Sequence, residues 1–215
     1  MCNIFKNNAG ATVELFPMGD QSILISSLGR GFQQDSTRLL IDYSFSDFTF
    51  KGQNTYVLTR EITVGERSNS KLFMESGSII WINGPLTVNG ELSSIRTSEQ
   101  RGTIRSYAGM SFLHAKLNLE SVDVYQMDST VNTPTIISVF GQLSLLNASF
   151  HGSSTHIVAS TADSVTINNC EFGRNLEHGL DIWSGTLSVI NSRFMGSSSG
   201  NAIMATVSKQ TILHN

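Results

Sequence analysis

The sequence predicts an all-β fold, a parallel β-helix in which short strands wind into coils of about 22 residues. Three observations predict it. Four segments repeat without gaps, each begins with apolar residues at alternate positions, and each carries a serine or asparagine at its fifth position. Alternation of apolar and polar residues is typical of strands. A unit of this length cannot bury its apolar face alone, so successive units must stack around one core.

The repeated segments predict a tight bend in the middle of each unit. They span residues 117–124, 143–150, 165–172 and 187–194, and their starts lie 26, 22 and 22 residues apart. Positions one and three share one face of the chain, whereas after the bend positions six and eight share a face. One residue in the left-handed conformation produces this change of parity, and asparagine tolerates that conformation well. The bends should therefore stack at Ser121, Asn147, Asn169 and Asn191.

Further strands complete the predicted coils. A third strand precedes the repeats at 136–139, 180–183 and 202–205, and earlier strands are expected at 56–58, 61–64 and 80–88. Residues 1–50 do not follow the period, and we expect an irregular N-terminal cap or attachment segment there, with the β-helix over 51–215. A β-sandwich of hairpins is the alternative, but Asn-Gly and Asp-Gly turns at regular spacing are missing. Because Asn215 falls at a bend position, the β-helix is expected to continue beyond it or to be covered by a partner.

Composition excludes several classes of protein. Only 14% of the residues are charged, 40% are hydrophobic and the net charge is −3, which argues against disorder and against a nucleic-acid partner. No apolar run is long enough for a membrane span. The N-terminus lacks the apolar region of a secretory signal. Cys2 and Cys170 are expected to be free thiols, and no cluster has zinc spacing, so we expect neither a metal nor a cofactor.

Residues 165–182 resemble the repeat of the right-handed parallel β-helices of the pectate-lyase-like superfamily, and the resemblance extends over about 55–215. Residues 52–64 look like the start of the β-helix in bacteriophage tailspikes. This resemblance implies a homotrimer on a virion, made in the host cytoplasm, that binds or cleaves host-surface polysaccharide and contacts other virion proteins through its N-terminal segment. Residues 172–175 and 200–203 resemble motifs of β-helical adhesins, which would place the protein outside the cell or on its surface.

A candidate saccharide site follows from the strand at 180–183. Inward-pointing Leu180 and Ile182 leave Asp181 and Trp183 facing solvent. Tryptophan offers a flat apolar surface to a sugar ring, and charged groups bind its hydroxyls. Arg174 and His178, in the loop before this strand, are the expected binding partners of Trp183, together with the carboxylate of Glu177 in the same loop. Trp81 and Tyr125 are weaker candidates of the same kind.

Two functions remain open at this site. Recognition of host-surface polysaccharide by a tailspike-like protein is the first, and an adhesin is a variant of it. The second is a polysaccharide-degrading enzyme in which Glu177 and Asp181 form the acid pair of a glycoside hydrolase, or in which Arg174 is the base of a lyase. A polar column is also expected on the surface, with an ion pair between its last two members: Asp123, Ser149, Glu171 and Arg193.

Overall fold

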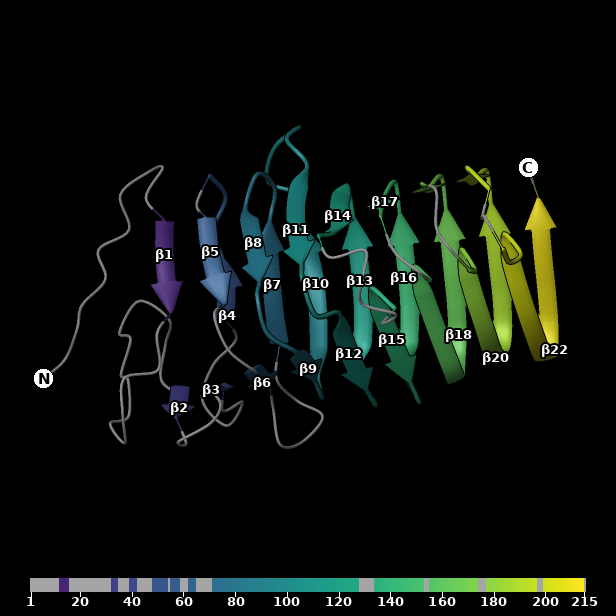
Figure 1. Cartoon of the computed structure of the whole chain (residues 1–215), viewed down its shortest axis with the longest axis horizontal. Helices are drawn as coiled ribbons and strands as arrows, with labels where there is room; N and C mark the ends of the chain where they lie inside the picture. Colours follow the sequence, from purple (N-terminus) through teal and green to yellow (C-terminus); the bar gives the residue numbers. More distant parts are fainter. Residues whose placement is uncertain are drawn as a thin grey trace, which may run out of the picture.

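The structure is a computed structural model, and it describes the chain in eleven stretches. These stretches contain strands, turns and bends but no helix, and they cover residues 12–15, 32–34, 39–41, 48–53, 55–58, 62–64, 71–127, 134–152, 155–173, 177–196 and 199–214. The strands stack along the long axis of the molecule, from β1 near the N-terminus to β22 at the C-terminal end (Figure 1). The all-β parallel solenoid predicted from the sequence is confirmed.

Each coil contributes strands to three faces. The first face contains β1 (Thr12–Leu15), β5 (Thr55–Leu58), β8 (Ile79–Ile82), β11 (Gly102–Ser106), β14 (Val122–Gln126), β17 (Ser149–His151), β19 (Glu171–Phe172) and β21 (Arg193–Phe194). The second face contains β3 (Leu39–Ile41), β6 (Ile62–Val64), β9 (Leu86–Val88), β12 (Met110–Leu113) and β15 (Ile136–Val139). The third face contains β4 (Phe48–Phe50), β7 (Lys71–Glu75), β10 (Glu91–Ile95), β13 (Lys116–Glu120) and β16 (Gln142–Leu146).

In the last three coils, one long strand bends across both the second and the third face. These strands are β18 (Ile157–Asn168), β20 (Leu180–Ile190) and β22 (Ile203–His214). The register fixes the coil length, because Met110, Ile136, Ile157, Leu180 and Ile203 are successive partners in parallel pairs. Equivalent residues are therefore 21 to 26 positions apart along the chain.

The predicted bends stack at the corner between the third and first faces. Ser121, Asn147, Asn169 and Asn191 have φ angles of 55°, 51°, 52° and 48°, in the left-handed region. The Asn147 side-chain amide donates to Ser121 Oγ at 3.1 Å, and the Asn169 amide donates to Asn147 Oδ1 at 3.4 Å. The parity change read from the sequence thus has the predicted backbone cause, and side chains link three of the four bends.

The core is built from columns of identical or similar side chains. Val124, Phe150 and Phe172 are fully buried and in register, and Phe194 continues their column. The rings of Phe150 and Phe172 stack at 5.1 Å between centroids, and those of Phe172 and Phe194 at 4.8 Å. Such in-register stacking follows from the spacing of about 4.8 Å between neighbouring strands. The apolar eighth position of each repeat therefore supplies the inside of the first face.

Strands near the N-terminus also join the solenoid. β1 pairs with β5, β3 with β6 and β4 with β7, all parallel, while β2 (Phe32–Gln34) pairs antiparallel with β3. The rest of the predicted cap at 1–50 lies outside the described residues, and so do Cys2 and Asn215. The described residues include no helix of the length and hydrophobicity that crossing a bilayer requires.

Candidate functional site

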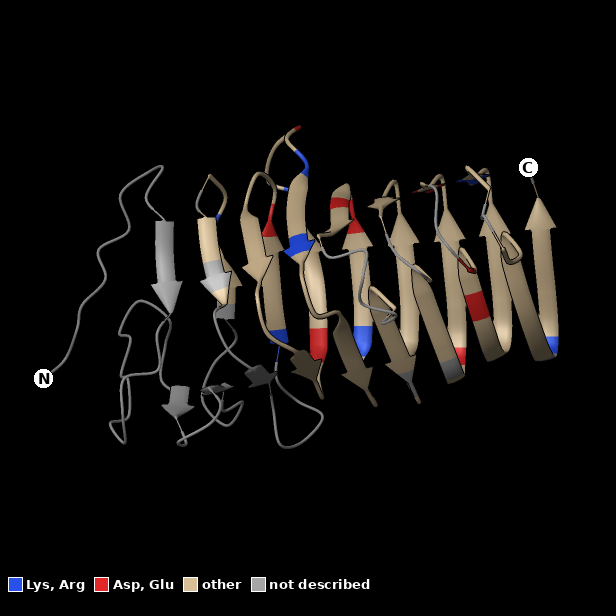
Figure 2. Ribbon diagram, in the orientation of Figure 1, with Lys and Arg blue, Asp and Glu red and all other residues tan. Residues whose placement is uncertain are grey.

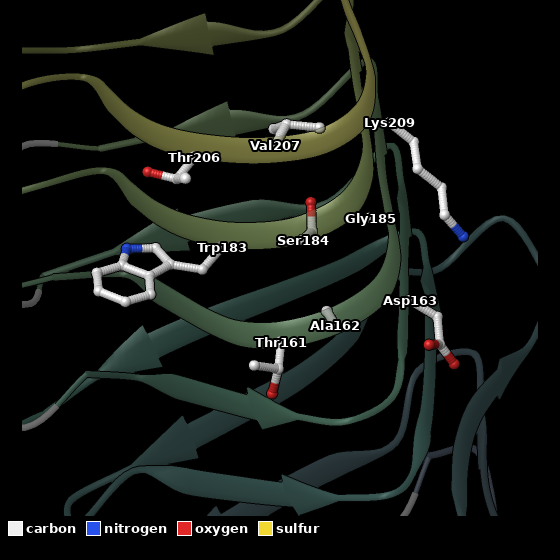
Figure 3. Close-up of a pocket in the computed structure, with 9 residues that line it drawn as sticks. All are labelled: Thr161, Ala162, Asp163, Trp183, Ser184, Gly185, Thr206, Val207 and Lys209. Carbon is white, nitrogen blue, oxygen red and sulfur yellow. The ribbon is translucent and has the colours of Figure 1, made fainter.

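A surface pocket lies where the second face turns into the third face, on the last three coils (Figure 3). It has a volume of about 430 Å³ and is lined by Thr161, Ala162, Asp163, Trp183, Ser184, Gly185, Thr206, Val207 and Lys209. Trp183 and Thr206 are in-register partners on β20 and β22. The pocket therefore takes one stretch of chain from each of three neighbouring coils.

Irregular pairing at the corner opens this pocket. Thr161 adopts a φ of 53°, and the register between β18 and β20 shifts next to it. A second shift follows Ser184, in the pairing of β20 with β22. Bulges of this kind bend a strand and redirect its side chains. The three strands therefore turn the corner with unequal numbers of residues, and the pocket lies at this irregularity.

Gly185 lines the pocket at a position where a side chain does not fit. A Cβ atom at this position would lie 2.7 Å from the carbonyl oxygen of Asp163 and 3.8 Å from Lys209 Cδ. The first distance is a clash with backbone, which cannot yield as a flexible side chain does. Glycine is thus required by the close approach of β18.

The pocket combines an aromatic surface with polar groups. The Trp183 side chain is 56% exposed, and it lies on one side of the bend, while Asp163 and Lys209 lie on the other (Figure 3). Neither charged group forms an ion pair with another residue in the described part of the chain. An apolar ring face, a carboxylate and an ammonium group are thus available around one hollow, and they suit a ligand with both apolar and hydroxyl-bearing surfaces.

Among the predicted site residues that the structure describes, only Trp183 lines this pocket. Asp181 lies two residues earlier on the outside of β20, between Val158 and Met204 of the neighbouring coils. No acid therefore flanks it in register, as expected from the sequence. Its Oδ1 atom is buried and has no hydrogen-bond partner among the described residues.

Glu177 and His178 lie together just before β20, away from the pocket. The Thr155 hydroxyl donates to Glu177 Oε2 at 3.3 Å, and the Asn201 backbone N–H donates to His178 Nδ1 at 3.0 Å. Trp183 follows Glu177 by six positions, at most about 20 Å along an extended chain. Arg174 lies outside the described residues. No hydrogen bond joins the carboxylates of Glu177 and Asp181, both of which the structure describes. Their pairing as acid and base stays a prediction.

The predicted polar column on the first face is confirmed as an in-register row of Asp123, Ser149, Glu171 and Arg193. Its ionic contact differs from the expected one. Arg101 Nε donates to Asp123 Oδ1 at 2.8 Å, and Arg101 also donates to Ser149 Oγ at 3.2 Å. Glu171 and Arg193, both described, form no ion pair. Arg101 comes from the segment between β10 and β11, which the repeats do not contain.

Sequence analysis missed most of the residues that line the pocket. The sequence does contain one signal of this corner, the small or polar residue that precedes each repeat by two positions, such as Asp163 or Gly185. Charged residues are few on the long strands β18, β20 and β22, as Figure 2 shows. Metal and thiol chemistry receive no support in the described stretches: no three His, Cys, Asp or Glu side chains could share a metal ion. Burial raises the pKa of the Cys170 thiol, which keeps this buried group protonated.

Comparison with known proteins gives no match to a family model, to a curated protein or to a solved structure.

Proposed function

We propose that this chain recognises host-surface polysaccharide as the β-helix of a virion-associated protein of the tailspike or fibre type. The observation that carries the proposal is the exposed Trp183 at a pocket that also holds Asp163 and Lys209. Exposed tryptophan is unusual, because its ring buries more apolar surface than most side chains when it is covered. A sugar ring covers such a surface with its C–H face while its hydroxyls bind the charged groups nearby.

The shape of the pocket supports a polymer rather than a small metabolite. It is an open hollow on the side of a solenoid, with strands running past it on three coils. A polysaccharide can enter and leave such a hollow sideways, with one sugar unit seated at Trp183. Trimer formation and a place on the virion belong to the same proposal; light scattering in solution tests the first, and a stable monomer would contradict it.

Intrinsic fluorescence tests recognition at this pocket, because the chain has only two tryptophans, Trp81 and Trp183. In the Trp81→Phe variant, emission reports on Trp183 alone. We expect a saturable change in emission when a recognised capsular or O-antigen polysaccharide is added. Trp183→Ala in the otherwise unchanged chain should weaken binding at least tenfold, measured by calorimetry.

A matched control is Phe140→Ala, since Phe140 is 53% exposed at the same type of corner two coils earlier and lies outside the pocket. This variant should bind as the wild type does. Unchanged affinity in Trp183→Ala, or equal losses in both variants, would contradict the proposed site.

Polysaccharide cleavage is the second candidate, favoured by the buried Oδ1 of Asp181, which has no hydrogen-bond partner in the described part of the chain. A buried carboxyl oxygen that no hydrogen bond satisfies is unusual, and it makes Asp181 a candidate for proton transfer. Incubation with the recognised polysaccharide should then release shorter oligosaccharides, and both Asp181→Asn and Glu177→Gln should abolish their release. Intact polymer after long incubation with the wild-type protein would exclude the enzyme and leave recognition as the function.

A further inference from the structure

A second set of aromatic side chains follows the outside of the first face. Trp81, Arg105, Tyr125 and His151 occupy successive strands β8, β11, β14 and β17 as direct in-register partners. All four are partly exposed. We call this row the aromatic column. None of its members lines the Trp183 pocket, which lies at a different corner of the solenoid.

Within the aromatic column, the Arg105 guanidinium lies between two aromatic rings. Its central carbon is 4.7 Å from the centroid of the Trp81 ring and 5.9 Å from that of Tyr125. The rings are themselves supported, because Trp81 stacks on Tyr107 at 6.3 Å and Tyr125 stacks on His151 at 4.7 Å. Cation–π contact with a ring on each side limits the movement of the guanidinium.

Arg105 has no anionic partner in the described part of the chain. No ion pair and no side-chain hydrogen bond there involves it, although its guanidinium carries five N–H donors. The nearby Arg101 is different, since its guanidinium binds the carboxylate of Asp123, the hydroxyl of Ser149 and the carbonyl of Val122. The carboxylate of Asp123, two residues before Tyr125 on β14, is thus engaged by Arg101, whereas Arg105 has no ion pair in the described part of the chain.

We propose that the aromatic column is a second binding site, selective for a sugar that carries a carboxylate or sulfate group. The two rings flank the guanidinium, so its N–H edge that points away from them is left for an acceptor. A carboxylate or sulfate accepts two parallel hydrogen bonds from this edge. Trp81 and Tyr125, on either side, then contact the apolar face of the same sugar or of its neighbour.

The surroundings favour an acidic glycan over a nucleic acid. Single-stranded nucleic acids also combine stacking with phosphate contacts, but they are bound by grooves with many cations. This column offers one free arginine on a chain of net charge −3. The single guanidinium of Arg105 can pair with one anionic group, which suits a polymer that carries few charges, each on a sugar ring.

The test uses Trp183→Phe, in which Trp81 is the only remaining tryptophan. Oligogalacturonate, dextran sulfate, unmodified dextran and poly(dT) are titrated against this variant. We expect saturable quenching of Trp81 by at least one of the two acidic glycans and none by dextran. Since Trp183 is absent, this result is independent of the first pocket, and the two sites can succeed or fail separately.

Substitution of the arginine completes the test in the same single-tryptophan background. Arg105→Gln should weaken binding of the acidic glycan at least tenfold, and Arg105→Lys should restore only part of it, because an ammonium group lacks the planar fork. Arg96→Gln is the control, since Arg96 is exposed and already paired with Glu99. Far-UV circular dichroism verifies that each variant is folded. No binding of either acidic glycan, equal binding by Arg105→Gln, or tighter binding of poly(dT) would overturn the proposal.

Discussion

Removing the middle ring of the phenylalanine column should destabilise the solenoid strongly. Phe172 is 1% exposed and its ring is stacked on both sides, against Phe150 and Phe194. Truncating a buried phenylalanine to alanine costs about 3–5 kcal/mol, through lost transfer free energy and the cavity that remains. The two ring contacts, each worth about 0.5–1.5 kcal/mol, place Phe172 in the upper part of this range. Backbone pairing at about 4.8 Å prevents the neighbouring coils from closing the gap. We therefore expect Phe172→Ala to lose about 4–5 kcal/mol.

Urea unfolding followed by circular dichroism measures this loss. Phe140→Ala makes the same chemical change at an exposed position, where Phe140 stacks only on His114, and it should lose less than about 1 kcal/mol. Because each coil contacts only its neighbours, hydrogen exchange in Phe172→Ala should accelerate most in β17, β19 and β21. A loss below about 1 kcal/mol for Phe172→Ala, or equal losses in both variants, would refute the stacked core.

Three further predictions concern the corners and a buried histidine. Asn169→Ala should lose about 1 kcal/mol in urea unfolding and Asn169→Gly less, because only glycine adopts a φ of 52° without strain; the reverse order would contradict a left-handed bend. Gly141→Ala should lose about 3 kcal/mol of unfolding free energy or fail to fold, because the added Cβ would lie 2.1 Å from the Ala115 carbonyl oxygen. A melting temperature equal to that of the wild type would contradict this close contact. Burial lowers the pKa of His156 below its usual value of 6.5, and this effect outweighs the hydrogen bond between its ring and the Gly173 carbonyl, which raises the pKa. As the pH falls through 6.5, the unfolded chain therefore takes up a proton that the folded chain does not. Stability should therefore be highest above pH 6.5 and fall below it, and His156→Phe should remove this part of the pH dependence; parallel pH profiles of the two proteins would show that His156 is not its source.

The sequence contains most of the information about the repeated part of the fold. The switch of apolar parity at Asn147, Asn169 and Asn191 has one simple backbone explanation, and the structure has it. The outward position of Trp183 also follows from alternation alone, because Leu180 and Ile182 are both apolar and buried. Such features depend only on neighbours along one strand, and local pattern is sufficient to predict them.

The pocket and the aromatic column required the structure, because both depend on contacts between coils. The pocket depends on unequal residue numbers at the Thr161 corner, and no repeat reveals where a bulge falls. In the coil that contains Arg105, the insertion at 96–101 separates β10 from β11. The aligned repeats do not include this coil, so they do not pair Arg105 with Tyr125. Glu171 and Arg193 are in-register neighbours as predicted, but the expected ion pair between them was wrong. The ion pair of the polar column is instead made by Arg101, from that insertion, with Asp123.

Cysteine cross-linking tests the coil register, on which both proposed sites depend, most directly. Ser144 and Thr166 are in-register partners on the third face, and Ser188 follows one coil later. In a background with Cys2→Ser and Cys170→Ala, the pair Ser144→Cys and Thr166→Cys should form a disulfide on mild oxidation, because its Cα atoms are about 4.8 Å apart. The pair Ser144→Cys and Ser188→Cys, about 10 Å apart, should remain reduced. Efficient bridging of the second pair, or none of the first, would contradict the register of the coils.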